Sequence, residues 1–206
     1  MRKLIASAAC VAAWTGLAAP PSAAGPPSAI VFENARVRVW KVTTAPAVFA
    51  QRGAVFVAIE DDAKRKAGEV YWSRVPESAG PNVVGTFVIV EPKESASTPT
   101  PTPSAAHPEA ANPVFTGMSF VPLFENDRVN VIRGRMDVGA REGLHTHASD
   151  IVLVHLTGGT IEDVAGGKTS VNRWKHGDVE FEGRGSSHSA RNLGPAVEAI
   201  LVTLKP

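Results

Sequence analysis

The stretch that decides the fold runs from residue 177 to residue 192 and has the pattern Gly177-x5-Gly183-x-Gly185-x2-His188-x3-Asn192. Gly177 stands in a His-Gly-Asp sequence, which is typical of a tight turn between strands. Gly183 and Gly185 bracket a flexible segment, because glycine tolerates backbone angles that other residues avoid. We therefore expect the following strand to bend and to carry His188 toward the interior of a β structure.

A second pair of histidines lies upstream, in the sequence His145-Thr146-His147. Residues i and i+2 of a strand point to the same face, about 7 Å apart. This spacing suits two neighbouring ligands of one metal ion, with His188 as the third from another strand. The alternative is a relic site, in which the ring nitrogens bond to one another or to water.

These residues resemble the two motifs of the cupin superfamily. Gly139-x5-His145-x-His147 looks like the start of the first motif, and residues 177–192 match the second at every spacing, with Gly183 in place of the usual proline. The resemblance implies an all-β fold, a small antiparallel barrel of the jelly-roll type. It also implies a divalent metal ion, either Fe, Zn, Ni, Cu or Mn, held by the three histidines and a glutamate.

The glutamate of the first motif is missing, because its position holds Ile151. Asp150 is adjacent, but neighbouring strand residues face opposite sides. A bulge, or the start of the strand, would be needed to turn Asp150 inward, and we carry it as a candidate fourth ligand. Without it, three neutral imidazoles still suit Fe(II), Zn(II), Ni(II) or Cu(II), and thiol dioxygenases of the cupin family also use three histidines.

An internal repeat organises the chain. Residues 32–39 return as residues 124–131 with six of eight positions identical. We therefore expect two tandem cupin-like units, a degenerate one over residues 30–92 and a cupin domain over residues 114–206. A linker rich in Pro, Ser, Thr and Ala joins them over residues 93–113. The first unit lacks the histidines, and we expect it to pack on the second and cover a sheet edge.

Short apolar runs followed by turn signals, such as residues 54–59 and 151–156, favour strands throughout, and no helical period persists. Residues 1–24 read as a secretory signal peptide, with Arg2 and Lys3 before an apolar run and cleavage after Ala24. A membrane-anchoring helix is the alternative, but the run is short and prolines follow it. We expect a secreted or periplasmic protein.

Composition excludes several functions. Twenty-one basic and twenty acidic residues indicate neither a nucleic-acid nor an anionic-membrane partner. The one cysteine, Cys10, precludes a disulfide framework or a cysteine zinc site. The sequence shows no nucleophile elbow, phosphate loop or CxxC motif.

The sequence also predicts the environment or role of other residues near these motifs. We expect His155 to be a hydrogen-bonded core histidine and His176 to be solvated. The arginines near the mouth of the site are candidates to bind a substrate carboxylate, and the acids are candidates for proton transfer; these are Arg141, Arg184 and Arg191, and Glu142, Asp150 and Glu180.

Three functions stay open. The first is an exported metal-dependent cupin enzyme, a small-molecule dioxygenase or isomerase. The second is a non-catalytic cupin that binds a small molecule, and the third is a structural β domain with a relic metal site. No membrane contact is expected after signal cleavage, and a homodimer is compatible with the sequence.

Overall fold

A computed structural model describes residues 29–43, 53–63, 65–73, 85–93 and 114–206 of this chain. The regular elements of these residues are all strands, as the sequence predicts. In this part of the chain no helix is long and apolar enough to cross a membrane. The predicted signal peptide, residues 1–24, and nearly all of the predicted linker lie outside the described residues.

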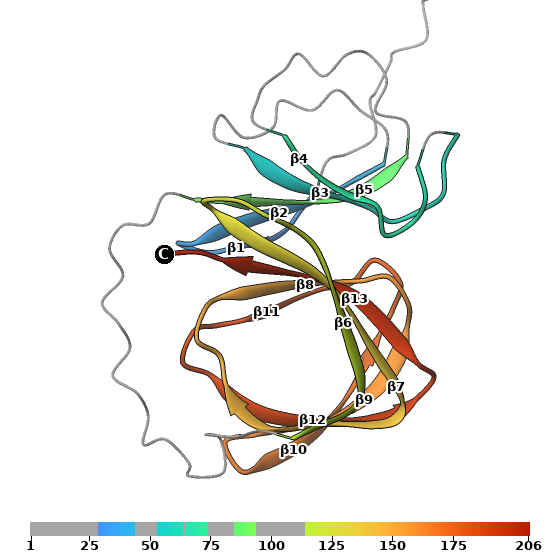
Figure 1. Cartoon of the computed structure of the whole chain (residues 1–206), viewed down its shortest axis with the longest axis vertical. Helices are drawn as coiled ribbons and strands as arrows, with labels where there is room; N and C mark the ends of the chain where they lie inside the picture. The colour runs from blue at the N-terminus through green and yellow to red at the C-terminus, as the bar shows by residue number, and fades with distance from the viewer. Residues whose placement is uncertain (1–28, 44–52, 64, 74–84, 94–113) are drawn as a thin grey trace, which may run out of the picture.

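The N-terminal unit is an open antiparallel sheet of five strands in the order β1-β2-β5-β3-β4 (Figure 1). Its strands are rich in valine and aromatic residues, which suit a pleated, half-buried surface. Their bounds are β1 Ala29–Glu33, β2 Val37–Thr43, β3 Ala54–Ala58, β4 Val70–Ser73 and β5 Thr86–Pro92.

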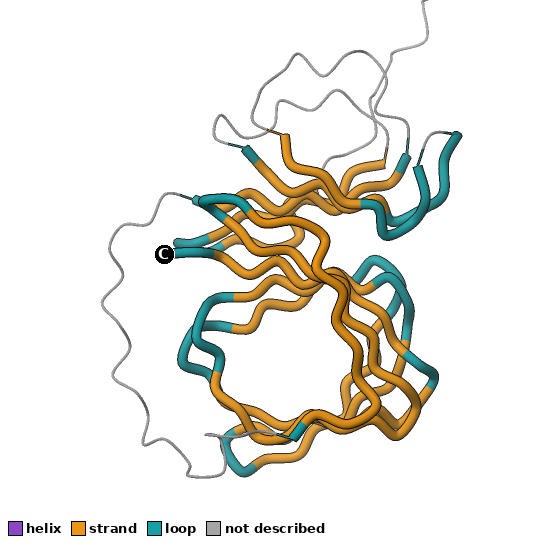
Figure 2. The backbone as a smooth tube through the Cα atoms, viewed as in Figure 1, coloured by secondary structure: helices purple, strands orange, loops and turns teal. Residues whose placement is uncertain are grey.

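The C-terminal unit is a sheet that curls into a barrel, with the strand order β10-β9-β12-β7-β13-β8-β11 and β6 beside β7 (Figure 2). The long strand β7 pairs with β13 along its first half and with β12 along its second, and Gly139, at φ +78°, lies between the two stretches. The bounds are β6 Phe115–Glu125, β7 Val129–Thr146, β8 Ile151–His155, β9 Gly159–Ala165, β10 Lys168–Trp174, β11 Val179–Glu182, β12 Ser187–Gly194 and β13 Val197–Leu204.

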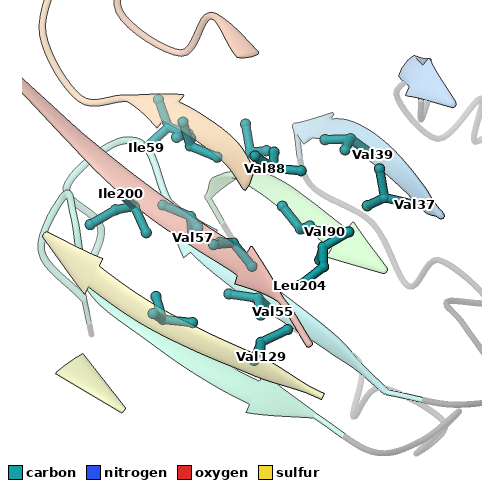
Figure 3. Packing of buried hydrophobic residues seen from close by; sticks show 14 of the residues in the cluster. Val37, Val39, Val55, Val57, Ile59, Val88, Val90, Val129, Ile200 and Leu204 are labelled. Carbon is teal, nitrogen blue, oxygen red and sulfur yellow. The ribbon is translucent and has the colours of Figure 1, made fainter. Parts of the chain in front are cut away.

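The two units pack face to face through a valine-rich layer (Figure 3). Val57 and Val90 of the N-terminal sheet lie in one buried cluster with Val154 and Val202 of the barrel, all at 0 % exposure. The first unit therefore covers a face of the second, whereas the sequence suggested that it covers an edge. The reason is the period of two, which gives both sheets an apolar side that must be buried.

The two copies of the repeated octapeptide form the same turn. The Asn34 side chain accepts hydrogen bonds from the backbone N–H groups of Arg36 and Val37, and Asn126 does the same for Arg128 and Val129. The strand order of the first sheet also corresponds to β6-β7-β13-β8-β11 of the barrel. The barrel adds β9, β10 and β12, and β12 is the strand that carries His188.

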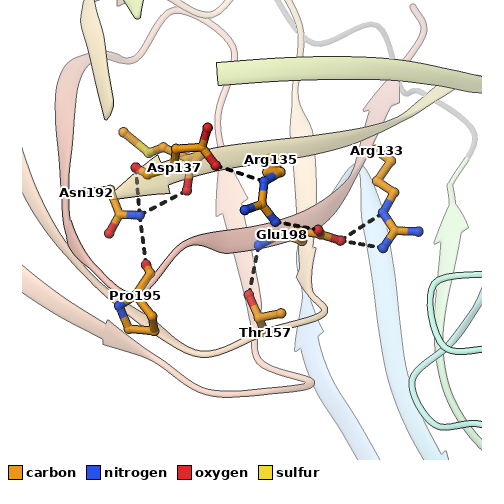
Figure 4. Close-up of polar contacts among 8 residues, drawn as sticks. Arg133, Arg135, Asp137, Thr157, Asn192, Pro195 and Glu198 are labelled. Carbon is orange, nitrogen blue, oxygen red and sulfur yellow. Dashed lines mark hydrogen bonds and ion pairs between the residues drawn. The ribbon is translucent and has the colours of Figure 1, made fainter. Parts of the chain in front are cut away.

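Asn192, the last residue of the opening pattern, ties the barrel together (Figure 4). Its side chain is 1 % exposed and donates hydrogen bonds to the backbone carbonyls of Met136, Asp137 and Pro195. The side-chain oxygen of Asn192, Oδ1, accepts a hydrogen bond from the backbone N–H of Gly194. Asn192 is thus a structural residue that joins β12 to β7 and holds the two histidine-bearing strands side by side.

Candidate metal centre

The structure brings His145, His147 and His188 together, as their spacing predicts. His145 lies near the end of β7, His147 follows that strand, and His188 on β12 is the register partner of His145. One donor atom from each of the three rings lies within 4.8 Å of the other two. Register partners on neighbouring strands share a face, which is why the third imidazole meets the first two.

Hydrogen bonds fix how two of the rings point. The Nδ1 atom of His145 lies 3.0 Å from the carbonyl oxygen of Gly143, and that of His188 lies 2.8 Å from Oδ1 of Asp163. Both oxygens accept hydrogen bonds, so each Nδ1 carries the proton and each Nε2 keeps a lone pair. Carboxylate and carbonyl partners of this kind orient histidine ligands in metal sites.

The free ring nitrogens suit a metal ion. The Nε2 atoms of His147 and His188 are buried and have no hydrogen-bond partner among the described residues. Buried polar atoms in native proteins are almost always paired, so these two are explained if a cation takes up their lone pairs. A relic site closed by hydrogen bonds between the rings does not fit this geometry.

Glu182 supplies a carboxylate that the sequence analysis missed. Its two oxygens lie 3.5 Å from Nε2 of His147 and 3.6 Å from Nε2 of His188. Glu182 on β11 is the register partner of Ile151 on β8. The carboxylate that the cupin motif would place at residue 151 is therefore offered by the neighbouring strand, and the only sequence signal was the alternation of acids along β11.

These groups open into a cavity of about 300 Å³ inside the barrel. Ile151 lines it as an apolar wall, as predicted, and Glu142 and Glu180 reach it as well. Most of the remaining wall is apolar, with Met118, Phe120, Met136, Leu153, Ile161 and Leu201. An antiparallel barrel with the histidines of both motifs close together in its interior is the arrangement that the sequence resemblance implied.

Several of the solved structures to which this chain is similar are cupin domains. No family model and no curated protein matches this sequence. Solved structures do match, among them a cupin domain from Bordetella pertussis Tohama I, with 22 % identity and a TM-score of 0.41 over 44 % of this chain and 95 % of that one. KdgF from Halomonas sp. matches at 20 % identity and a TM-score of 0.38, over 44 % of this chain and 80 % of that one. An RmlC-like cupin from Shewanella frigidimarina matches at 20 % and 0.37, over 44 % and 78 %.

Asp150 does not join the histidines inside the barrel. Its Oδ2 atom lies 3.0 Å from Nε of Arg36, and its Oδ1 atom accepts a hydrogen bond of 2.8 Å from the backbone N–H of Arg184. Asp150 precedes the first residue of β8, and there it turns toward the N-terminal sheet instead of the barrel interior. Asp150 is therefore not positioned to bind the same metal ion as the histidines, and the prediction of Asp150 as a fourth ligand is wrong.

The arginines are also displaced from the positions expected of them. Arg141, Arg184 and Arg191 are exposed, and none of them lines the cavity of the barrel. Arg141 and Arg191 are register partners on β7 and β12, between residues that do face inward. His176 is exposed as predicted, although its Nδ1 atom bonds to the carbonyl oxygen of Leu156 at 2.7 Å.

Burial dominates the electrostatics of the site. It raises the pKa of Glu182 to about 7, against the attraction of His188. Burial, together with the charges of His145 and His188, lowers the pKa of His147 to about 4. Burial also raises the pKa of Glu142. For His188 burial acts downward, but the attraction of Glu182, the hydrogen bond to Asp163 and the charge of Glu142 raise its pKa overall.

Proposed function

We propose that this protein is an exported, metal-dependent cupin enzyme that acts on a small molecule held in the barrel cavity. His145, His147 and His188 would hold a divalent metal ion, with Glu182 as the fourth donor. The observation that carries the proposal is the set of unpartnered, buried Nε2 atoms directed at one point beside a carboxylate. Imidazole with carboxylate is a donor set suited to Fe, Mn, Ni, Cu or Zn.

The residues around the site suit proton transfer. A bound divalent metal polarises a substrate oxygen and so acidifies the neighbouring C–H or O–H bond. Glu142 lies with Oε1 3.6 Å from Nε2 of His145, and burial raises its pKa toward the range useful for general acid–base work. Glu142 would take a proton from the substrate and return it. Isomerisation is the reaction class that uses these features.

Dioxygenation is a second candidate, and a site with three histidines favours it. The lowered pKa of His147 keeps that ligand neutral, and an apolar cavity admits O2 readily. The two classes separate in one measurement on the iron-loaded or manganese-loaded protein with a panel of small molecules. Isomerisation introduces solvent deuterium into the substrate without consuming O2, whereas dioxygenation consumes O2. A molecule that binds and shows neither change favours a non-catalytic binding protein.

Export rests on the N-terminal sequence, with its basic start, apolar run and small residues before position 25. Expression of the full chain in a bacterial host followed by fractionation tests it. We expect a mature chain that begins at Gly25 in the periplasm or medium. An intact N-terminus that stays with the cells would contradict export.

Metal content tests the central claim. Protein purified without a polyhistidine tag is expected to hold about one equivalent of a transition metal. His188→Ala and His147→Ala should lose that metal and keep the circular dichroism spectrum of the wild type. His176→Ala is the matched control, because it removes an imidazole outside the cluster and should retain the metal. Equal metal content in all four proteins would place the ion elsewhere.

A further inference from the structure

A second polar pair lies in the cavity, beyond the metal centre along β8 and β11. His155 is 0 % exposed, and neither of its ring nitrogens has a hydrogen-bond partner among the described residues. The Oε2 atom of Glu180 is equally buried and unpartnered. It lies 3.6 Å from Nε2 of His155, which is too long for a hydrogen bond between them. His155 is a core histidine, as the sequence predicts, but the expected hydrogen bond is not formed.

The imidazole is held rigidly in this place. The ring of His155 stacks on Trp174 of β10, with centroids 4.0 Å apart and planes 27° from parallel. All three side chains, those of His155, Trp174 and Glu180, line the cavity. An apolar residue would fill such a position at lower cost, because unpaired polar groups destabilise a folded protein. A fixed ring with unsatisfied nitrogens on a cavity wall is a feature of ligand-binding sites.

We propose that His155 and Glu180 bind a hydroxyl group of the molecule that occupies the cavity. This assignment rests on the proposed function, since it places the far end of the same substrate. A hydroxyl donates to the carboxylate of Glu180 and accepts from a ring N–H of His155, so that one group satisfies both side chains. A carboxylate is repelled by Glu180, and an ammonium group is repelled by the divalent ion proposed at the three histidines.

The charges of the cavity restrict the rest of the ligand. Four acids line it, namely Glu142, Asp163, Glu180 and Glu182. Among the described lining residues the one arginine or lysine is Arg135, whose guanidinium pairs with Asp137 and Glu198 (Figure 4). At the Glu180 end of the cavity, away from the metal centre, such a wall disfavours an anionic group. The apolar remainder of the wall suits a neutral carbon skeleton.

The distance between Glu180 and Glu182 along β11 indicates the length of the ligand. Glu180 and Glu182 are two residues apart on one face of β11, which is about 7 Å. The bound hydroxyl therefore lies about one ring diameter from the group beside the metal centre. The ligand class is a small, neutral, hydroxyl-bearing molecule with a ring-sized apolar body.

Two ring probes of similar size test this on the metal-loaded full chain: 4-methylphenol and toluene, titrated with ligand-observed NMR. We expect 4-methylphenol to bind about tenfold more tightly than toluene. His155→Phe and Glu180→Gln should weaken 4-methylphenol binding about tenfold and leave toluene binding within about twofold. Equal affinities of wild type for 4-methylphenol and toluene would overturn the assignment.

Glu162→Gln is the matched control, because it makes the same change on β9 between two residues that face the cavity, Ile161 and Asp163. It should bind 4-methylphenol as the wild type does. His155→Phe keeps an aromatic ring against Trp174 and removes two unpaired nitrogens, so its Tm should equal or exceed that of the wild type. A lower Tm with unchanged affinity for 4-methylphenol would make His155 a structural residue.

Metal content separates this inference from the proposed function. His155→Phe and Glu180→Gln should retain the metal of the wild type, whereas His188→Ala should lose it. A wild type without metal that still prefers 4-methylphenol refutes the metal centre alone. A metal-bearing wild type that binds toluene as tightly refutes the hydroxyl site alone.

Discussion

The carboxylate beside the histidines comes from Glu182, and not from Asp150, the residue that the sequence suggested. Asp150 stands beside the position where the first motif would carry its glutamate, yet its carboxylate bonds to Arg36 and to the N–H of Arg184. Glu182 comes from the second motif, and it faces His147 and His188. The difference lies in the strand pairing, which sets Glu182 directly opposite Ile151.

The pH dependence of metal binding tests Glu182 as a donor. Its pKa of about 7, raised by burial, means that a proton must leave before the carboxylate binds a cation. Apparent affinity for Zn²⁺ should therefore rise as the pH increases from 6 to 8, by up to about tenfold per unit. His147, with a pKa lowered to about 4, is neutral over this range and contributes no step.

Glu182→Gln removes this titrating carboxylate. It also removes the attraction that, against the effect of burial, raises the pKa of His188. We expect Zn²⁺ affinity at pH 8 to fall about ten- to a hundredfold and the rise between pH 6 and 8 to flatten. Calorimetric titration across this range measures both, with Glu162→Gln as the control. A variant that keeps the wild-type slope would show that Glu182 is not a donor.

At the level of elements, the repeated octapeptide forms one turn twice. Asn34 caps the turn between β1 and β2, and Asn126 caps the turn between β6 and β7. Each turn is also bonded by the lysine that directly follows the last strand of its unit, Lys93 to Glu33 and Lys205 to Glu125. The two octapeptides, identical at six of eight positions, thus form the same local contacts in an open sheet and in a barrel.

Replacement of either asparagine by alanine should cost a similar amount of stability. Each change leaves two partly buried backbone N–H groups without their acceptor, at about 1–2 kcal/mol for the pair. Urea denaturation of Asn34→Ala and Asn126→Ala measures this. Asn130→Ala, on β7, is the control, because that side chain makes no hydrogen bond within the described part of the chain. A loss in one turn and none in the other would mean that the two caps are not equivalent.

The whole molecule is joined across its two units by more than the valine layer. Arg36 bonds to Asp150 and to the carbonyl oxygen of Lys205, while Arg128 bonds to the carbonyl oxygens of Pro92 and Lys93. In each unit, the arginine of the repeated turn thus bonds to the end of the last strand of the other unit. Both arginines occupy the same position of the octapeptide, which explains the reciprocity.

Asp150→Asn separates an interface role from a metal-binding role. The change removes the charge that pairs with Arg36, and it should lower the free energy of unfolding by about 1–3 kcal/mol. Metal content should stay at the wild-type level, because Asp150 lies outside the histidine cluster. Arg36→Gln should destabilise by a similar amount. Loss of metal from Asp150→Asn, with its stability intact, would restore Asp150 as a ligand.

The correct predictions came from patterns among residues close together in the sequence. The period of two in strands placed His145 and His147 on one face, and the glycine spacing after Gly177 brought His188 to meet them. Gly177 and Gly185 have φ of +75° and +83°, a conformation that glycine adopts without strain. Such features depend on residues a few positions apart, and a single sequence therefore displays them.

Only the tertiary structure decided which carboxylate joins the histidines and which surface the first unit covers. Glu182 meets the cluster because β11 pairs with β8 in one register, and a shift of one residue would turn it outward. Asp150 is kept out of the histidine cluster by its hydrogen bond to Arg36, a residue 114 positions earlier. His155 and Glu180 meet across the same pair of strands. Strand alternation determines the face on which a side chain lies, but its partners depend on the pairing of distant strands, which no local pattern specifies.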